Sequence, residues 1–254
     1  MPSVLYEVKE EIGWLTINRP HIRNAVNFDV MAQMKQYIRQ AADDPAVKIL
    51  VVTGSGSKAF CSGGDLSAFH SLNSSAEALV MLSEMGSILK SLFYFPKLSA
   101  ALINGTAVGG GCELAASCDI RLAAGEAKLG FIQGRLGIST GWGGGSYLLE
   151  RISGSNALDM LCSASLFTSK QAYENQFLQY VFKDSDIKSA AGNYLKRYTL
   201  QPLGVIQSYK QLLLDKVDKA SLETRIAEEI KRCSILWESE EHHERVREFL
   251  SRKP

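Results

Sequence analysis

An apolar strand, a glycine-rich turn and a short helix follow one another three times in this sequence, and this pattern constrains the fold most. The three strand candidates lie at residues 49–53, 98–103 and 119–123. Runs with little polar alternation are typical of strands buried on both faces, as in a parallel sheet covered by helices. The pattern therefore predicts an α/β protein of stacked strand-turn-helix units rather than two unrelated domains.

The rest of the 254-residue chain is predicted to be mainly helical beyond about residue 155. Asn27 is a suitable N-cap for one helix, and residues 168–171 form a capping-box pattern that opens another. The other predicted elements are strands at 4–9 and 14–18 and helices at 27–42, 75–93, 186–198, 203–214 and 219–251. We expect an α/β core at 1–190 and a helical region at 191–254, with no linker between them.

Charge and composition exclude several classes of protein. The 28 Lys and Arg residues balance 27 Asp and Glu residues, whereas a dedicated nucleic-acid-binding protein is usually strongly basic. The N-terminus lacks a signal-peptide pattern, and no run of about 18 apolar residues occurs that could cross a membrane. The five cysteines form no C-x-x-C pair and do not cluster with the four histidines. We therefore expect reduced thiols, a cytoplasmic location and no metal site.

Glycine-rich turns after strands also occur in nucleotide-binding proteins, so that function has to be weighed. Residues 54–59 fit the dinucleotide pattern G-x-G-x-x-A. A dinucleotide site requires a helix to open within the pattern, whereas Gly63 and Gly64 extend the loop here. No P-loop sequence occurs either. The sequence therefore predicts no nucleotide cofactor.

Two of the glycine turns suggest a different chemistry. Ser62 precedes Gly63 and Gly64, and Gly110 lies within the glycine triplet 109–111; a helix follows each turn. Glycine lets a ligand approach the backbone closely, and N–H groups at a helix N-terminus are free donors. Two such groups directed at one carbonyl oxygen form an oxyanion hole. The alternative is that both turns only pack helices on a sheet.

The flanks of these turns resemble the hallmark segments of the enoyl-CoA hydratase/isomerase (crotonase) family. The two segments are residues 59–66, AFCSGGDL, and residues 104–115, NGTAVGGGCELA. Four further stretches are similar to family segments, so the resemblance covers nearly the whole chain: 18–25, 118–121, 136–144 and 237–254. The resemblance implies a spiral of strand-strand-helix repeats with a helical C-terminal region.

The same resemblance implies an enzyme that acts on an acyl-CoA thioester, with no cofactor apart from the CoA of the substrate. It assigns the oxyanion-hole donors to the backbone N–H groups of Ser62 and Gly110, and places Arg23 and Ala25 near the CoA. The other substrate-binding positions are Gly63, Gly64, Asp65, Leu66 and Trp142. Asp65 also suits a structural role at the start of a helix.

Self-association follows from the family resemblance as well. Family members are commonly trimers or hexamers whose terminal helices contact neighbouring subunits. Trp237, Phe249 and Leu250 give the terminal region of this chain more apolar surface than a lone exposed helix should show. We therefore expect residues 191–254 to take part in a homotrimer or hexamer.

The acid–base residues depart from the family pattern. Glu113 matches the first of the two glutamates that family hydratases use on water, but the second position holds Gln133. A neutral amide can hold water but cannot take or give its proton. Thr140 also stands where the family usually has proline. Glu113 is thus the only acid–base group of the usual pair, unless it is a buried carboxylate that merely caps a turn.

Three functions remain open from the sequence. The first is a lyase or isomerase that works with Glu113 alone. The second is a malonyl-type decarboxylase, because residues 136–144 resemble those of methylmalonyl/ethylmalonyl-CoA decarboxylases. The third is a non-catalytic acyl-CoA or RNA-binding relative, and no basic run supports the RNA option. We expect His70 to be a core or solvated residue, and His242 and His243 to lie on a solvated helix face.

Overall fold

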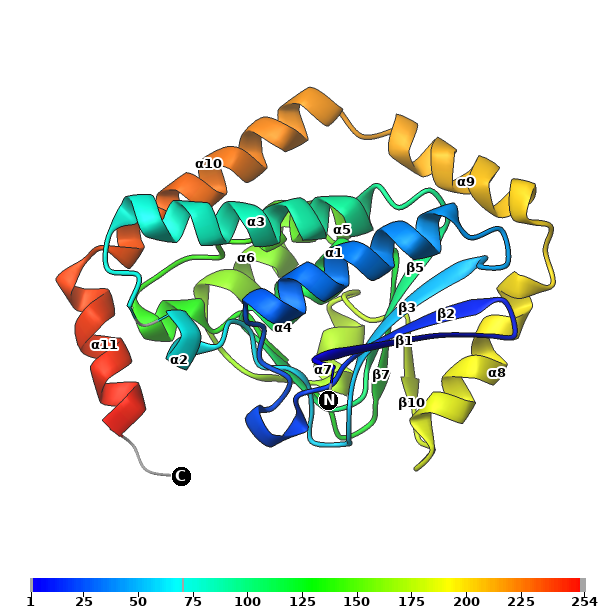
Figure 1. The fold of residues 1–254 in the computed structure, drawn as a ribbon, viewed down its shortest axis with the longest axis horizontal. Helices are drawn as coiled ribbons and strands as arrows, with labels where there is room; N and C mark the ends of the chain where they lie inside the picture. Colours follow the sequence, from blue (N-terminus) through cyan, green and yellow to red (C-terminus); the bar gives the residue numbers. More distant parts are fainter. Residues whose placement is uncertain (1, 70, 252–254) are drawn as a thin grey trace.

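Each predicted repeat contributes strands to two sheets in the computed structural model, which describes residues 2–69 and 71–251 (Figure 1). In the larger sheet β1 pairs antiparallel with β2, and the other neighbours are parallel. Its strands lie in the order β1 (Val4–Lys9), β2 (Ile12–Ile17), β3 (Ile49–Gly54), β5 (Leu98–Ile103), β7 (Ile120–Ala124) and β10 (Tyr180–Phe182).

The smaller sheet was not foreseen from the sequence. It consists of β4 (Ala59–Cys61), β6 (Thr106–Val108), β8 (Lys128–Gly130) and β9 (Phe167–Thr168), of which the first three pair in parallel. These strands have at most three residues, which is too short to show an alternating pattern. Each of β3, β5 and β7 leads directly into β4, β6 or β8. The predicted strand-strand-helix spiral is therefore confirmed.

The helices surround both sheets. They are α1 (Phe28–Asp43), α2 (Leu66–Phe69), α3 (Ser75–Phe93), α4 (Gly110–Ser117), α5 (Gly144–Arg151), α6 (Gly154–Cys162), α7 (Ser169–Glu174), α8 (Ile187–Thr199), α9 (Leu203–Asp215), α10 (Lys219–Trp237) and α11 (Glu240–Ser251), with short 3-10 turns η1 (Pro20–Ile22) and η2 (Gln133–Leu136). Asn27 caps α1, and a capping box formed by Thr168 and Gln171 opens α7, as predicted. Within the described ranges, no helix is both long and apolar enough to cross a membrane.

One predicted helix in the C-terminal half is wrong. The single helix expected at 219–251 is two helices, because the Ser239 hydroxyl accepts the N–H of His242 and donates to the carbonyl of Leu236. The domain boundary expected after residue 190 falls inside α8. Ala191 and Leu195 of this helix pack on the larger sheet in one core cluster with Trp14, so α8 belongs to the α/β core.

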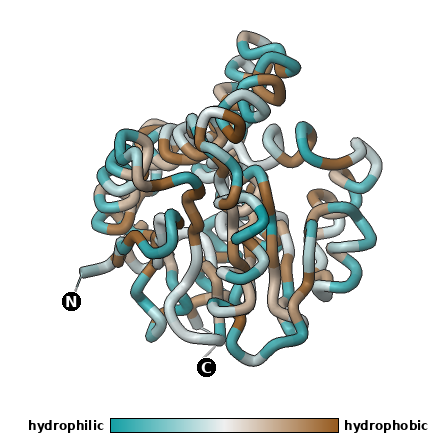
Figure 2. The backbone as a smooth tube through the Cα atoms, turned by 90° about the vertical axis from the view of Figure 1, so that its right-hand side faces the viewer, coloured by the Kyte–Doolittle hydropathy of each residue, from teal (hydrophilic) through white to brown (hydrophobic). Residues whose placement is uncertain are grey.

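The main core lies between the two sheets and the helices that cover them. In Figure 2 the hydrophobic segments of the tube run through this interior along the strands. All eight residues of α4 are buried, and α10 packs along α3 at the outer edge of the molecule. The N-terminus of α4 therefore lies at the point where β4 and β6 end.

The packing of α4 generates a test of the fold. A Cβ atom on Gly111 would lie 2.1 Å from the carbonyl oxygen of Cys61 in β4, and backbone cannot move aside like a flexible side chain. We expect Gly111→Ala to lower the free energy of unfolding by about 1–3 kcal/mol, as for other overpacked sites. Urea denaturation would measure it.

Gly192 in α8 provides the matched control. A Cβ atom there meets nothing within 4 Å. Gly192→Ala should therefore raise the free energy of unfolding by about 0.5–1 kcal/mol, because alanine loses less backbone entropy in a helix. Equal stability of the two variants would contradict the close contact between α4 and β4.

Candidate active site

The two glycine turns meet because the strands before them pair in parallel. β4 precedes Gly63, and β6 precedes Gly109. These glycines have φ angles of 89° and 55°, in the left-handed region that residues with a Cβ atom rarely adopt. A Cβ atom on Gly63 would lie only 3.0 Å from the backbone nitrogen of Gly110. The structure thus brings the two predicted turns into contact.

The assignment of Ser62 as an oxyanion-hole donor is wrong. Its backbone N–H donates to the carbonyl of Arg23 at 3.1 Å and is not available to a ligand. Gly64 and Val26 form a parallel bridge in which the hydrogen bonds are made by the residues on either side of Gly64. The N–H of Val26 donates to the carbonyl of Gly63, and the N–H of Asp65 donates to the carbonyl of Val26. Because successive N–H groups of extended backbone point in opposite directions, the N–H of Gly64 faces away from Val26.

The backbone N–H groups of Gly64 and Gly110 at this junction are free of protein acceptors. Across residues 2–69 and 71–251, nothing accepts a hydrogen bond from the N–H of Gly64 or of Gly110. Gly110 is the first residue of α4, where the helix itself provides no acceptor. The donor pair of the structure is therefore Gly64 and Gly110. The sequence could not identify Gly64, because only the pairing with Val26 fixes the direction of its N–H.

Trp142 covers this junction. A Cβ atom on Gly110 would lie 2.2 Å from Cζ3 of the indole ring, and one on Gly64 would lie 3.8 Å from Cζ2. Only residues without side chains can therefore occupy position 110. Trp142 is 4% exposed and comes from the turn before α5. Its predicted place in the site is consistent with these contacts.

Glu113 is buried beneath the junction and is held by four donors. Its Oε1 accepts from Nε2 of Gln133 at 2.8 Å and from the N–H of Gly141 at 3.3 Å. Its Oε2 accepts from the N–H groups of Trp142 and Gly144 at 2.8 and 2.9 Å. The carboxylate therefore caps the N-terminus of α5, in agreement with the alternative role as a buried capping group that the sequence analysis left open.

The pKa of Glu113 is raised to about 7. Burial is the main cause, and the nearby charge of Glu229 adds to it, while the backbone N–H groups act in the opposite direction. A carboxyl group with a pKa near neutrality can serve as a general acid or base. Capping and acid–base chemistry are thus both open to this residue.

Gln133 lies beside Glu113, as the sequence predicted for the pair. The side chain is 9% exposed, and its Nε2 is committed to Glu113. Its Oε1 is sealed from solvent and has no hydrogen-bond partner among the described residues. A buried acceptor without a partner is costly in free energy unless a ligand or water satisfies it. Gln133 thus presents one acceptor and no proton to the site.

Glu229 of α10 is a site residue that the sequence reasoning missed. It accepts from the N–H groups of Gly145 and Ser146 at 2.9 and 2.8 Å, and from the Ser146 hydroxyl at 2.6 Å. It therefore caps the N-terminus of α5, as Glu113 does, although it lies more than 100 residues later in the sequence. No local sequence signal connects position 229 with this helix, so only the fold could reveal it.

Asp65 holds its turn together rather than facing the junction. Its carboxylate accepts from Arg19 at 2.9 Å and from the hydroxyl and N–H of Ser67 at 2.6 and 3.1 Å. Burial opposes ionisation of Asp65, but these hydrogen bonds outweigh it, and the pKa is lowered. Arg19 also donates to the carbonyl of Ala25 at 2.9 Å, which fixes the segment that contains Arg23. The structural role considered for Asp65 matches this geometry.

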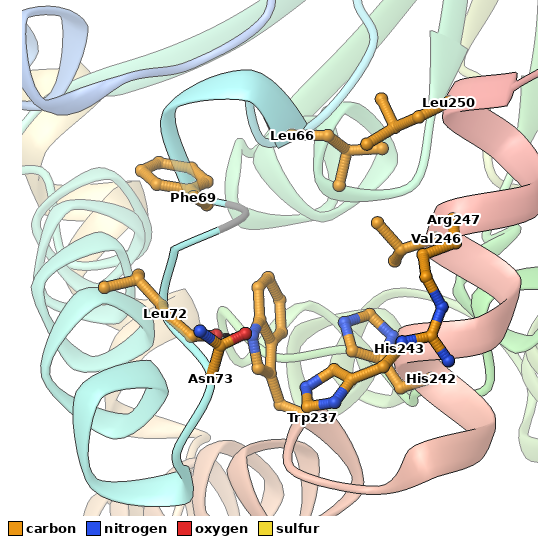
Figure 3. A pocket seen from close by; sticks show the side chains of 10 residues that line it. All are labelled: Leu66, Phe69, Leu72, Asn73, Trp237, His242, His243, Val246, Arg247 and Leu250. Carbon is orange, nitrogen blue, oxygen red and sulfur yellow. Dashed lines mark hydrogen bonds between the residues drawn. The ribbon is translucent and has the colours of Figure 1, made fainter.

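A cavity of about 200 Å³ opens beside α2 (Figure 3). Phe69 lies at both the cavity and the junction: it lines the cavity, and a Cβ atom on Gly64 would lie 3.1 Å from its ring. The cavity lies between α2, the following loop, and helices α10 and α11. Its lining residues are Leu66, Phe69, Leu72, Asn73, Trp237, His242, His243, Val246, Arg247 and Leu250.

The histidines of α11 differ from the expectation of a solvated face. His242 is 2% exposed, and its ring lies tilted against Trp237 with 4.8 Å between ring centroids. Its Nδ1 forms a hydrogen bond with the carbonyl of Leu136 at 2.7 Å. His243 lines the cavity. The helix turns this side toward the molecule because Trp237 and η2 lie there. His70 lies outside the described residues.

Comparisons with known proteins show the family and the fold. The family model described as enoyl-CoA hydratase/isomerase matches residues 7–254. The crotonyl-CoA hydratase of Syntrophomonas wolfei is 34% identical over 77% of this chain and 76% of that protein. The ethylmalonyl-CoA decarboxylase of Gallus gallus is 31% identical over 80% of this chain and 68% of that protein. The crystal structure of an enoyl-CoA hydratase from Bacillus halodurans has a TM-score of 0.88 at 23% identity, covering 97% and 99% of the two chains.

The burial of Glu113 generates a titration test. Its pKa of about 7 lies above the ordinary value of about 4.3, so the folded protein holds a proton that the unfolded chain releases. The stability from this group is complete below about pH 4 and is lost as the pH rises through 7. We expect carbon-13 NMR of labelled glutamate to show one carboxyl resonance titrating near pH 7, absent in Glu113→Gln. A midpoint near 4 for that resonance would contradict it.

Proposed function

Because this chain belongs to the enoyl-CoA hydratase/isomerase family, we propose that it is an enzyme that stabilises an enolate of an acyl-CoA thioester. The pair of acceptor-free N–H groups at Gly64 and Gly110 carries this proposal. Together they would bind the thioester oxygen as its negative charge develops, and one such donor contributes about 2.7–4 kcal/mol to a transition state. The CoA belongs to the substrate, so the proposal includes no separate cofactor.

The CoA and acyl parts of the substrate have candidate positions on either side of this junction. Arg23 is exposed and forms no ion pair with any described residue, so its guanidinium is available to a CoA phosphate. Ala25 lies in the same segment. On the other side, the cavity that begins at Leu66 is largely apolar and suits an acyl chain.

Decarboxylation of a malonyl-type thioester is the reaction that the site supports best. Loss of CO2 gives the enolate directly, so the oxyanion hole can act without a proton acceptor. Gln133 cannot transfer a proton, and both oxygens of Glu113 are already occupied by N–H donors. The ethylmalonyl-CoA decarboxylase among the relatives supports this choice.

Hydration or isomerisation with Glu113 alone is the second candidate. The pKa of Glu113, raised to about 7, suits a group that gives and takes a proton near neutral pH. The crotonyl-CoA hydratase of Syntrophomonas wolfei supports this candidate. The two candidates differ in one requirement: hydration needs proton transfer by the protein, and decarboxylation does not.

A homotrimer or hexamer is part of the proposal. Leu200, Tyr209 and Leu212, in and just before α9, are 80%, 68% and 62% exposed. Apolar side chains gathered on one outer helix favour a protein partner. Of the residues chosen from the sequence, Phe249 and Leu250 are exposed, but Trp237 is buried and adds no surface. The proposed contact between subunits is therefore formed by α9 rather than by Trp237.

A cytoplasmic location is also proposed. All five cysteines are free thiols, and four of them are buried. Free thiols persist in a reducing compartment, whereas secreted proteins usually pair them. The free thiols therefore support a cytoplasmic location.

Oligomerisation can be tested by sedimentation. The wild-type protein should sediment as a trimer or hexamer at micromolar concentration, and Leu212→Glu should dissociate it because a charge would replace a buried apolar contact. Leu5→Glu on β1 is the control, since Leu5 is partly exposed away from α9. A wild-type monomer at this concentration would overturn the proposal.

The reaction can be tested with Gln133→Glu. Nε2 of Gln133 lies 2.8 Å from Glu113, so the new carboxyl would share a proton with Glu113 and restore an acid–base pair. Hydration of crotonyl-CoA should be slow in the wild type and rise by about 10²–10⁴-fold in the variant. Decarboxylation of methylmalonyl-CoA should fall, because a second carboxylate repels that of the substrate.

Products would be followed by mass, with 3-enoyl-CoA added as the test for isomerisation. Gln36→Glu, on the exposed face of α1, is the control and should change neither rate. Wild-type hydration at thousands of turnovers per second would show that Gln133 does not limit proton transfer. Binding of acyl-CoA without any turnover would indicate the non-catalytic relative.

A further inference from the structure

We propose that the indole N–H of Trp142 binds the carboxylate of a malonyl-type acyl-CoA and holds it in position to leave as CO2. This inference rests on the proposed decarboxylation. It assigns a substrate-contacting role to the side chain that packs against Gly64 and Gly110.

The orientation of the indole ring follows from its contacts with the two glycines. Atoms Cε3, Cζ3 and Cη2 face Gly110, while Cζ2 faces Gly64. Nε1 is bonded to Cε2, which is the neighbour of Cζ2 in the ring. The N–H of Trp142 therefore lies on the Gly64 side, at the edge of the junction that holds the two free backbone donors.

This N–H is available to a ligand. Within the described part of the chain no atom accepts a hydrogen bond from Nε1 of Trp142, and Nε1 is not among the partnerless polar atoms that are sealed from solvent. Trp237 differs, because its Nε1 donates to the carbonyl of Leu72 at 2.8 Å. A small part of Trp142 thus reaches solvent-accessible space, and its polar edge belongs to that part.

The ring cannot easily turn away. The backbone N–H of Trp142 is bonded to Glu113 at 2.8 Å, and the ring is packed against Gly110. The Phe69 ring also lies close to Gly64. Nε1 is therefore a preorganised donor, and a preorganised donor binds a carboxylate without first losing side-chain entropy.

A neutral donor suits decarboxylation better than a cation. In the reaction the bond between the α-carbon and the carboxylate breaks, its electron pair forms the enolate, and the charge moves to the thioester oxygen. CO2 leaves, and the α-carbon then takes a proton from water. An arginine at the carboxylate would stabilise the substrate more than the transition state, whereas one indole N–H orients the group with little such effect.

Trp142→Phe tests the inference, because it keeps an aromatic ring and removes the donor. For methylmalonyl-CoA we expect kcat/KM to fall by about 10–100-fold, the range for a hydrogen bond to a charged group. Binding of propionyl-CoA, which lacks the carboxylate, should change less than about threefold. Trp14→Phe is the matched control: Trp14 is also 4% exposed, but lies in β2 under Lys188.

A measurement on the wild-type protein avoids dependence on the variant. The chain has three tryptophans, so nitrogen-15 NMR should show three indole N–H signals. The probe is 2-sulfonatopropionyl-CoA, in which a sulfonate that cannot leave as CO2 replaces the carboxylate. It should shift the Trp142 signal downfield and slow its exchange with water, and propionyl-CoA should not.

The outcomes separate this inference from the proposed function. If the wild type decarboxylates methylmalonyl-CoA but Trp142→Phe does so equally well, or the Trp142 signal ignores the sulfonate, the role of Trp142 is wrong and the function stands. If the wild type neither decarboxylates methylmalonyl-CoA nor binds the sulfonate, the proposed decarboxylation fails. An equal loss for both thioesters in Trp142→Phe would indicate a packing role only and would overturn the inference.

Discussion

Two buried carboxylates at the N-terminus of α5 are the interaction on which the rest of the site depends. Glu113 from α4 and Glu229 from α10 together accept the N–H groups of residues 141, 142 and 144–146. Free N–H groups and the helix dipole favour negative charge there, and burial opposes it. These hydrogen bonds hold α4, α5 and α10 together at the N-terminus of α5, although the three helices are far apart in the sequence.

Glycines at the contacts allow α4 and α5 to approach closely enough for these hydrogen bonds. A Cβ atom on Gly144 would lie 2.3 Å from the side chain of Glu113, and one on Gly110 would overlap the ring of Trp142. The glycines let α4, α5 and the indole approach within contact distance. This packing also brings the turns of Gly64 and Gly110 together while both N–H groups stay without an acceptor. The packing that stabilises the core therefore also creates the donor pair.

The electrostatics of the site follow from this arrangement. The carboxylate of Glu113 is used to cap a helix, its neighbour is an amide, and the remaining groups at the junction are neutral donors. Such a site offers neutral donors to a negative oxygen and leaves proton transfer to Glu113, whose pKa is raised to about 7. This arrangement supports the proposed decarboxylation and the proposed role of Trp142.

The sequence by itself determined the repeated strand-turn-helix order, the family resemblance and the pairing of Glu113 with Gln133, because apolar patterning, glycine turns and motif spacing are local properties. It misassigned the donor at Ser62, missed the smaller sheet and had no signal for Glu229. These depend on which strand lies beside which. The pairing of Gly64 with Val26 decides where an N–H points, and α10 reaches α5 only after the chain has folded. Tertiary structure alone therefore decided which backbone N–H groups remain without an acceptor and which buried carboxylates accept hydrogen bonds.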